Sequence, residues 1–402
     1  MKVAFFHDTP LLFCNDGNVY SIGFDYSVWQ RYLKVFDKMI VCTRVRNDTV
    51  DENNRRGMKL SNGPNVEFRP IDKYKKNFDA LTNLKGISLQ IREALQLVDC
   101  AIIRLPSTIG IVAYKEALKL GKPFGVEVVG CPWDALWNYG NITGKVAAPI
   151  FYVITKRIIK NSKYTIYVTK NFLQKRYPTY GINSHCSNVN IPNTSEEILA
   201  NRISRISKLA RNNVIKIGMI GALGSKYKGF DLAIEATSIL LKSYKNIELH
   251  ILGPGDKSRW EAYARKLGIA ERVYFDGTLP NGEEVYSWLD NVDIYIQPSK
   301  QEGLPRALIE AMSRGCPAIG SRTAGIPELL EEKVIHKKGN SRDLALKIEQ
   351  LLLDSNLIIE QAKKNFYKSK EYIKDVLDER RRAFWLDFKK YVVEHQSEHI
   401  RI

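Results

Sequence analysis

The stretch IYIQPSKQEGLPRALIEAM, residues 294–312, predicts a strand, a short loop and a helix in that order. The run IYIQPSK has the β-branched and aromatic residues of a buried strand, and Gly315 is a stop signal after the helix. The chain places one carboxylate, Glu302, just ahead of the helix and a second, Glu310, inside it. A strand that leads through a loop into a helix is the repeating unit of a parallel α/β sheet.

The same unit recurs in both halves of the chain. Strand-like runs alternate with segments whose apolar residues have helical spacing. The strand-like runs are VAFF, MIVCT, VEFRPI, CAIIRL, FGVEVV and YTIYVT in the first half, then VIKIGMIG, IELHILG, VYFDG, DIYIQP and PAIGS in the second. Strand, helix and strand in succession imply right-handed crossovers and a mostly parallel sheet. We therefore predict an α/β fold of two doubly wound, Rossmann-like domains, residues 1–205 and 206–379.

The tail DVLDERRRAFWLDFKKYVVEHQ predicts a last helix. Its large apolar side chains lie near one stripe: Val376, Phe384, Trp385, Phe388 and Val392. Such a stripe is too apolar to be exposed to water. We expect a C-terminal helix, about residues 380–402, to pack back on the first domain.

Length and composition indicate a globular protein. The chain has 402 residues, of which 44% are hydrophobic and 26% charged, so it is long enough for two domains with a core each. No apolar run has the length of a membrane span, and the N-terminus reaches His7 and Asp8 after only four apolar residues, which excludes a secretory signal. Six scattered cysteines give neither zinc-ligand spacing nor a disulfide framework. We expect a cytoplasmic protein.

The net charge is strongly positive, +17, and it is unevenly distributed. Residues 135–195 contain no Asp or Glu but eight basic side chains, namely Lys145, Lys156, Arg157, Lys160, Lys163, Lys170, Lys175 and Arg176. Such a surface favours contact with the phosphates of nucleic acids, lipids or nucleotide substrates. The stretch KVAAPIFYVITKRIIK mixes apolar and basic residues and predicts contact with an anionic membrane, on the inner face of the plasma membrane. A solvated basic face without a partner is the alternative.

The loop and first turn of the helix quoted above have the features of an anion site. In doubly wound sheets, ligands lie beyond the carboxyl ends of the strands, where helix N-termini offer unpaired N–H groups. Pro305 suits the first helical position, so Leu304 is the expected N-cap and Gly303 lets an anion approach. Carboxylates beside a phosphate bind the hydroxyls of a sugar, and a nucleotide sugar has hydroxyls on both sides of its diphosphate. A surface ion pair of Glu310 with the arginine four residues earlier is the alternative, although this order of charges is the weaker one.

The two glutamates, with seven residues between them in EGLPRALIEAM, resemble the signature of the retaining glycosyltransferases of family 4. That family has the GT-B fold, in which two Rossmann-like domains face each other across a cleft. The stretch IGMIGALGSKYKGFDLAIEA is similar to the family's strand, glycine loop and Lys-Gly entry to a helix, so the resemblance covers residues 214–331. In the first half, FGVEVVGCPWDALWNYG and YTIYVTKNFLQKRYP are more loosely similar to capsular and exopolysaccharide glycosyltransferases.

The resemblance implies retaining transfer of a hexose-type sugar from a UDP- or GDP-sugar to a lipid-linked or oligosaccharide acceptor, in bacterial surface polysaccharide synthesis. Glu302 would contact the transferred sugar and Lys228 the donor diphosphate, as the catalytic residues. The other donor-binding residues would be Gly224, Lys226, Gly277, Thr278, Leu279, Ser299, Gly303, Leu304 and Glu310, with Glu310 at the ribose hydroxyls and Ser299 near the ribose and base. We expect no cofactor and no metal, because the chain has no acidic metal motif and its histidines, among them His250, have no ligand-like companions.

The chain departs from the family pattern in both halves. GALG has Leu223 where many members carry Arg after the first strand of the second domain, so Lys226 would share the phosphate contact. VVGCPWD has Gly130 and Cys131 where many members carry a histidine. The candidates for the acceptor side are His7, Asp8, Gly17, Glu127 and Asp134, with Gly17 in a long loop HDTPLLFCNDGNVYS after the first strand.

Two other classes of protein stay open. Gly218, Gly221 and Gly224 suggest a nicotinamide-dependent oxidoreductase, but their GxxGxxG spacing lacks the tight GxG of a dinucleotide site. The positive charge suggests a nucleic-acid-binding protein, but the sequence has no zinc-finger spacing, RNP-like strand motif or helix-turn-helix.

Overall fold

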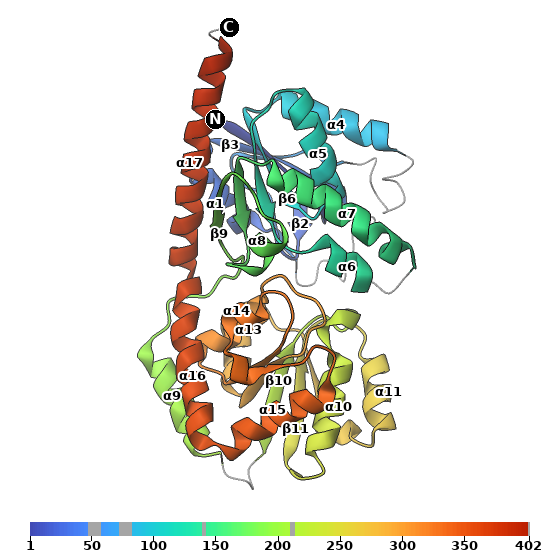
Figure 1. The fold of residues 1–402 in the computed structure, drawn as a ribbon, viewed down its shortest axis with the longest axis vertical. Helices are drawn as coiled ribbons and strands as arrows, with labels where there is room; N and C mark the ends of the chain where they lie inside the picture. The colour runs from blue at the N-terminus through green and yellow to red at the C-terminus, as the bar shows by residue number, and fades with distance from the viewer. Residues whose placement is uncertain (47–57, 72–82, 139–141, 210–213, 401–402) are drawn as a thin grey trace. The chain divides into compact units, whose positions relative to one another are not determined.

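A computed structural model describes residues 1–46, 58–71, 83–138, 142–209 and 214–400. The chain divides into two compact units, each built on its own parallel sheet (Figure 1). Unit 1 comprises Met1–Trp133, Val146–Cys186 and Asp378–Ile402, and unit 2 comprises Asp134–Lys145 and Ser187–Leu377. The elements of both units follow the predicted alternation of strands and helices.

The parallel strands of unit 1 follow the runs predicted from the sequence. In spatial order they are β5 (Val66–Phe68), β3 (Lys38–Val45), β1 (Lys2–Phe13), β6 (Cys100–Leu105), β7 (Phe124–Val128), β8 (Tyr164–Tyr167) and β9 (Ile182–His185). The order reverses between β1 and β6, as in dinucleotide-binding folds. The helices of this part of the chain are α1 (Tyr26–Leu33), α4 (Leu84–Gln96), α5 (Thr108–Lys119), α6 (Pro132–Asn138), α7 (Ile142–Lys160) and α8 (Phe172–Arg176).

The first strand is longer than predicted. It continues to Phe13 and pairs antiparallel with β2 (Val19–Ser21), which pairs with β4 (Lys59–Leu60). Gly17 occupies the exposed turn with φ of 81°. The stretch expected to be a long loop is therefore a β-hairpin, because Leu11 and Leu12 are buried and extend the core into it.

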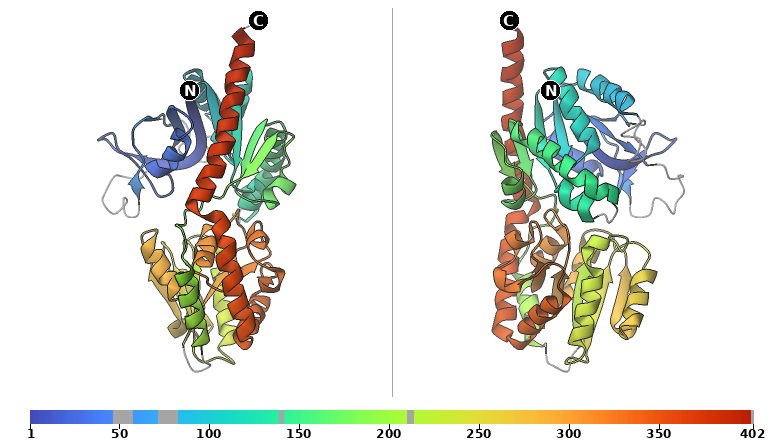
Figure 2. Two further views of the ribbon diagram at one scale, coloured as in Figure 1. Left: turned by 90° about the vertical axis from the view of Figure 1, so that its left-hand side faces the viewer. Right: turned by 45° about the vertical axis from the view of Figure 1, so that its right-hand side comes forward.

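The C-terminal helix, α17 (Lys374–Ile400), packs on unit 1 (Figure 2). The ring centroids of Trp385 and Tyr32 lie 6.3 Å apart. A Cβ added to Gly125 of β7 would come within 2.6 Å of the Trp385 indole, so any side chain at position 125 would displace that ring. Phe388 lies 5.4 Å from Tyr164. Val376 does not join this stripe and is 43% exposed, because nine residues, or two and a half turns, separate it from Trp385.

Unit 2 has a complete dinucleotide-type sheet. Its parallel strands are, in spatial order, β12 (Val273–Gly277), β11 (Ile247–Leu252), β10 (Ile215–Ile220), β13 (Ile294–Gln297), β14 (Ala318–Ser321) and β15 (Ile335–His336). The order reverses between β10 and β13. The helices are α9 (Glu196–Ser207), α10 (Phe230–Leu240), α11 (Ser258–Lys266), α12 (Glu283–Asp290), α13 (Arg306–Ser313), α14 (Ile326–Leu329), α15 (Ser341–Leu353) and α16 (Ser355–Ser369).

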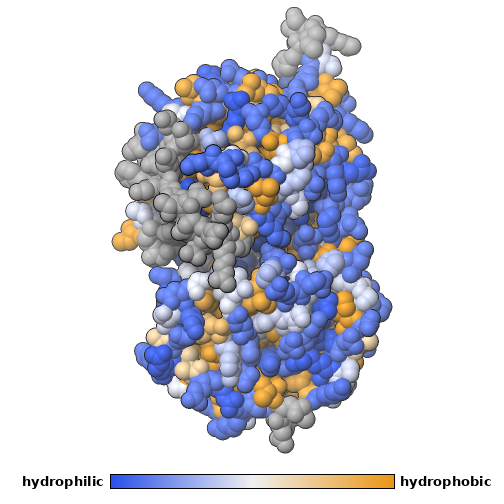
Figure 3. All heavy atoms as spheres, turned by 180° about the vertical axis from the view of Figure 1, so that it is seen from behind, coloured by the Kyte–Doolittle hydropathy of each residue, from blue (hydrophilic) through white to orange (hydrophobic). Residues whose placement is uncertain are grey.

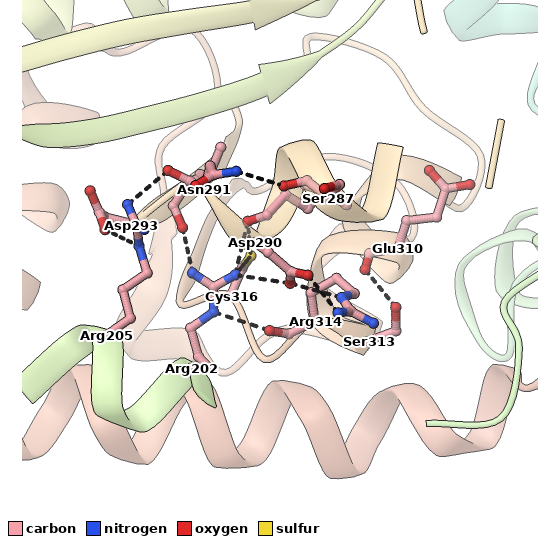
Figure 4. A network of polar contacts seen from close by, with 12 residues as sticks. Arg202, Arg205, Ser287, Asp290, Asn291, Asp293, Glu310, Ser313, Arg314 and Cys316 are labelled. Carbon is pink, nitrogen blue, oxygen red and sulfur yellow. Dashed lines mark hydrogen bonds and ion pairs between the residues drawn. The ribbon is translucent and has the colours of Figure 1, made fainter. Parts of the chain in front are cut away.

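Helix α9 belongs to unit 2, so the predicted boundary after residue 205 is too late and lies after Cys186 instead. The reason is Arg202, which is almost fully buried and donates to the carbonyl of Leu289 at 2.8 Å and to the carbonyl of Arg314 at 3.1 Å (Figure 4). A guanidinium that is hydrogen-bonded to buried carbonyls fixes its helix firmly to the element it contacts. Residues 196–205, predicted to end the first domain, are thus part of the second.

Candidate active site

The predicted donor residues gather at the carboxyl edge of the unit 2 sheet. At the point where strand order reverses, here between β10 and β13, the two connections leave on opposite sides of the sheet and make room for a ligand. The glycine loop with Lys228 follows β10, and the loop with Glu302 follows β13. Because these strands are parallel neighbours, both loops start at the same edge.

The two loops touch through their backbones. The N–H of Lys300 donates to the carbonyl of Tyr227 at 2.7 Å. Gly229 has φ of 81°, and a Cβ built on it would lie 2.3 Å from the carbonyl oxygen of Pro298. Any other residue would be strained and would collide here. The Lys-Gly pair predicted from the sequence thus has a structural reason, because the glycine lets the preceding lysine reach the β13 loop.

Lys228 and Glu302, the two predicted catalytic residues, form an ion pair. The Nζ atom of Lys228 donates to Oε1 of Glu302 at 2.7 Å, with side chains that are 21% and 9% exposed. The sequence placed both at the donor but did not predict this contact. A salt bridge so poorly accessible to water holds the ammonium and the carboxylate in fixed positions.

Two buried residues, one in β13 and one just after it, donate to the same carboxylate, and a third orients the first of them. Oε1 of Glu302 also accepts from Nε2 of Gln297 at 3.0 Å and from Oγ of Ser299 at 2.8 Å. Oη of Tyr295 donates to Oε1 of Gln297 at 3.0 Å, and burial raises the pKa of this phenol, which keeps its proton. Tyr295, Gln297 and Ser299 share one face because strand residues alternate. We call these three residues the β13 relay.

The β13 relay changes the interpretation of Ser299. Ser299 was predicted to lie near the ribose and base; its side chain is completely buried, with its hydroxyl between Gln297 and Glu302. Its hydroxyl is thus hydrogen-bonded to Glu302 within the protein. Sequence reasoning missed Tyr295 and Gln297, although polar groups at every second position of a buried strand just ahead of Glu302 were a visible signal.

Helix α13 begins one residue later than predicted. Pro305 has φ of −71° and an extended ψ of 113°, so it is the N-cap and Arg306 is the first helical residue. In the described parts of the chain, the backbone N–H groups of Gly303 and Leu304 have no protein acceptor. Together with the first turn of α13 they present unpaired donors and the positive end of the helix dipole. This is a geometry that binds anions.

Glu310 points away from the polar network beneath α13. Figure 4 shows its carboxylate directed away from Arg202, Asp290 and Arg314. Burial raises the pKa of Glu310, although the charge of Arg306 opposes this. Within the described residues no ion pair between Arg306 and Glu310 is found, so the surface pair considered as an alternative does not form. A half-buried carboxylate that, in the described part of the chain, has no protein cation paired with it is suited to accept hydrogen bonds from hydroxyl groups.

The other donor candidates lie on the same edge of the sheet. Gly224 is open to solvent, and Lys226 is exposed in the single turn that also contains Lys228. Gly277 ends β12 with φ of 77°, Thr278 is exposed and Leu279 is half-buried. The groups suited to bind an anion and hydroxyls thus follow β13, and the other donor candidates lie in the loops after β10 and β12.

Two acceptor-side candidates in unit 1 are engaged with protein groups. Asp8 accepts from the N–H of Thr108 at 2.6 Å and of Ile109 at 2.8 Å, so it caps α5, while burial raises its pKa. Glu127 is buried and accepts from Oη of Tyr32 at 2.7 Å and from Arg104 at 2.9 Å. Both carboxylates therefore have structural roles in the sheet of unit 1.

The remaining acceptor candidates are not brought together. His7 contacts the hydroxyl of Thr9 at 2.5 Å, and burial, assisted by the charge of Arg104, holds its pKa well below the ordinary value. Gly17 is in the hairpin turn described above. Asp134, in the first turn of α6, groups with unit 2 and not with the predicted first domain, because its segment Asp134–Lys145 makes its contacts there.

His250 has two carboxylate neighbours in the sheet of unit 2. Its ring lies 3.1 Å from Asp276 and 3.3 Å from Glu248, and it stacks on Tyr274. Although burial lowers its pKa, the hydrogen bonds with the two carboxylates raise it overall. Across the residues that the structure describes, no group of three His, Cys, Asp or Glu side chains is arranged to hold a metal ion.

The family model of the glycosyl transferases group 1 matches residues 201–370. Protein CapJ of Staphylococcus aureus is 33% identical over 401 residues, which cover 98% of this chain and 97% of the relative. The amylovoran biosynthesis glycosyltransferase AmsK of Erwinia amylovora is 34% identical over 146 residues, 34% of this chain and 35% of the relative.

Solved structures resemble the whole chain. Anabaena HepE in complex with UDP and glucose has a TM-score of 0.64 at 15% identity, covering 96% of this chain and 99% of that one. Sucrose-phosphate synthase of Thermosynechococcus elongatus has a TM-score of 0.67 at 13% identity, covering 97% and 100%. At such low identity the likeness concerns the fold alone, and it confirms the predicted α/β, GT-B class. From the family match and the near full-length relative, the chain belongs to the group 1 glycosyl transferases.

Proposed function

We propose that the chain is a retaining glycosyltransferase that moves a hexose-type sugar from a UDP- or GDP-sugar to a lipid-linked or oligosaccharide acceptor in bacterial surface polysaccharide synthesis. Family membership excludes the oxidoreductase and the nucleic-acid-binding protein. Relatives named for amylovoran and colanic acid biosynthesis support the polysaccharide, and HepE structures with UDP-glucose support the donor. The observation that carries the proposal is the ion pair of Lys228 and Glu302 beside the N–H groups of Gly303 and Leu304.

The diphosphate of the donor would bind at the start of α13. The N–H groups of Gly303 and Leu304 donate to phosphate oxygens there, and the helix dipole adds to the attraction. Lys228 uses one of its three protons on Glu302 and keeps two for the phosphates. Negative charge grows on the diphosphate as its bond to the sugar breaks, and a fixed ammonium stabilises that charge.

The glutamates would bind the two sugars of the donor. Oε1 of Glu302 already accepts three hydrogen bonds, so Oε2 is the oxygen that meets a hydroxyl of the transferred sugar. Glu310 accepts the ribose hydroxyls. Further donor contacts come from the β10 and β12 loops, through Gly224, Lys226, Gly277, Thr278 and Leu279.

The reaction would proceed with retention and without a metal or another cofactor. The acceptor hydroxyl attacks the anomeric carbon from the face that the diphosphate leaves. The bond from that carbon to the diphosphate breaks, the new glycosidic bond forms on the same face, and the hydroxyl proton passes to the departing diphosphate oxygen. Among the residues of unit 1, His7 is the acceptor-side candidate whose ring is neutral, since its pKa is held low. We place the enzyme in the cytoplasm, on the inner face of an anionic membrane.

A screen of UDP- and GDP-sugars by thermal shift and product analysis tests this function. One donor should raise the unfolding temperature and support transfer, with unchanged anomeric configuration in the product by NMR and undiminished rate in EDTA. Lys228→Ala should abolish transfer without lowering the unfolding temperature, whereas Lys242→Ala, an exposed lysine just beyond α10, should be neutral. An inverted product would refute retention, and wild-type turnover in Lys228→Ala would refute the site.

A further inference from the structure

Helix α7 carries a line of exposed aliphatic side chains. Ile142 is 81% exposed, Val146 64%, Ile150 56% and Val153 62%. Spacings of four, four and three residues put them on one face of the helix. The opposite face is buried through residues such as Ala148 and Ile159. Singly exposed hydrophobic residues are ordinary, and on the face drawn in Figure 3 they are scattered among hydrophilic ones. An aligned set of four is not ordinary.

The same face becomes basic toward the end of the helix. Lys156, Arg157 and Lys160 are exposed, and at helical spacing they continue the line of Ile150 and Val153. We call these seven residues of α7, from Ile142 to Lys160, the α7 face. Residues 135–195 contain no acidic side chain, so nothing in this part of the sequence offsets that charge.

An exposed aromatic residue extends the α7 face. Tyr180 is 80% exposed, and the ammonium of Lys160 lies 4.9 Å from its ring centroid. Ile182, at the start of the edge strand β9, is 52% exposed. Tyrosine has an apolar ring and a polar tip, and it is enriched where lipid tails meet water.

We propose that the α7 face docks this protein onto an anionic lipid bilayer. The aliphatic line enters the boundary between headgroups and acyl chains, and the Lys and Arg side chains contact the lipid phosphates. No helix of the described residues is both long and apolar enough to cross a membrane, so this contact is in the plane of the surface. The inference rests on the proposed function in one respect: a lipid-linked acceptor would explain why the enzyme binds a membrane.

The charges favour a bilayer over a second copy of this chain. A second copy of the chain would bring the same cations and a net charge of +17 against this face, and like charges across an interface are unfavourable. A bilayer offers both an apolar layer and many phosphates, which match the aliphatic and basic side chains of the α7 face. In the right-hand view of Figure 2, α7 lies on the viewer's side of the unit 1 sheet.

Sedimentation with vesicles tests the proposal on the full chain. Wild type should bind vesicles of phosphatidylcholine with phosphatidylglycerol, bind phosphatidylcholine alone more weakly, and lose part of its binding as salt rises. Val146→Ser/Ile150→Ser should weaken binding to the anionic vesicles by about tenfold or more, since each buried aliphatic side chain contributes substantially. Lys156→Gln/Lys160→Gln should also weaken it by about tenfold and flatten the salt dependence.

The control is Leu346→Ser/Leu353→Ser on α15, where the side chains are 49% and 60% exposed, and it should bind like wild type. All variants should keep the wild-type unfolding temperature because they change exposed positions. Wild type that does not bind anionic vesicles at low salt would overturn the proposal. So would normal binding by Val146→Ser/Ile150→Ser, or a wild-type dimer that this double variant dissociates. Vesicle binding retained by Glu302→Gln, with transfer lost, separates this surface from the active site.

Discussion

Gln297→Leu should slow sugar transfer more than it changes donor affinity. The amide of Gln297 is 1% exposed and lies between Tyr295, Ser299 and Glu302. Leucine has a similar size but removes one of the three donors to Oε1 of Glu302. A hydrogen bond to a charged group contributes about 1.5–3 kcal/mol, so we expect kcat to fall by about 10- to 150-fold. The KM of the donor should change less, because the phosphate donors of α13 stay in place.

The same substitution should also destabilise unit 2. It leaves the fully buried hydroxyl of Tyr295 without its acceptor, which costs about 1–3 kcal/mol. Tyr295→Phe/Gln297→Leu removes the orphaned hydroxyl and should recover much of that stability. It should not recover kcat, because the donor to Glu302 is still missing. Tyr295→Phe alone controls for the loss of the phenol.

Steady-state kinetics and denaturant unfolding of the four proteins separate the two roles of Gln297. If the double variant regained both kcat and the free energy of unfolding, Gln297 would act only through folding. An unchanged kcat in Gln297→Leu would show that the β13 relay does not position Glu302.

Three further changes have outcomes set by single contacts. Gly229→Ala should lose more than about 1 kcal/mol of stability and most of the transfer activity. The control is Gly339→Ala, which has a similar φ of 74° and no atom within 4 Å of an added Cβ. In a thermal melt this control should show only the cost of the backbone strain. Burial raises the pKa of Glu310, so the folded protein keeps the carboxyl proton at pH values where the unfolded chain has lost it. The contribution of Glu310 to stability is therefore lost as the pH rises from its ordinary pKa of 4.5 through the raised pKa of the folded state. Glu310→Gln should remove this pH dependence when unfolding is measured across pH. Donor binding by calorimetry should weaken as pH falls through the same raised value, since the ionised carboxylate accepts the ribose hydroxyls, and a flat profile would speak against that role. Trp385→Ala should cost about 3–5 kcal/mol because the indole is fully buried between α17 and unit 1, whereas Val376→Ala at an exposed position should cost under about 0.5 kcal/mol; equal costs would contradict the packing of α17.

Local patterns were sufficient for most of the fold. Every predicted strand-like run became a strand, because buried parallel strands are short, apolar and bounded by turn residues. Such patterns do not contain pairings between distant segments. The docking of α9 joins Arg202 to Leu289, 87 residues away, and it was missed. The hairpin around Gly17 pairs residues close in sequence, but its second strand also pairs with Lys59 and Leu60, and it was missed as well.

The site was predictable by residue type and less so by contact. The two glutamates and the Lys-Gly pair, chosen by residue type, follow β13 and β10, the neighbouring strands of unit 2 between which the order reverses. The ion pair of Lys228 with Glu302 joins loops 74 residues apart, and only the approach that Gly229 allows brings them together. The burial of Ser299 and its hydrogen bond to Glu302 depend on how β13 ends, which the sequence pattern does not show.

A crystal structure with an intact UDP- or GDP-sugar tests the central claim most directly, that the start of α13 and Lys228 bind the diphosphate. We expect phosphate oxygens within hydrogen-bond distance of the N–H groups of Gly303 and Leu304 and of the Lys228 ammonium, with the transferred sugar on Oε2 of Glu302. A diphosphate bound elsewhere, with the Lys228–Glu302 pair untouched by ligand, would contradict it.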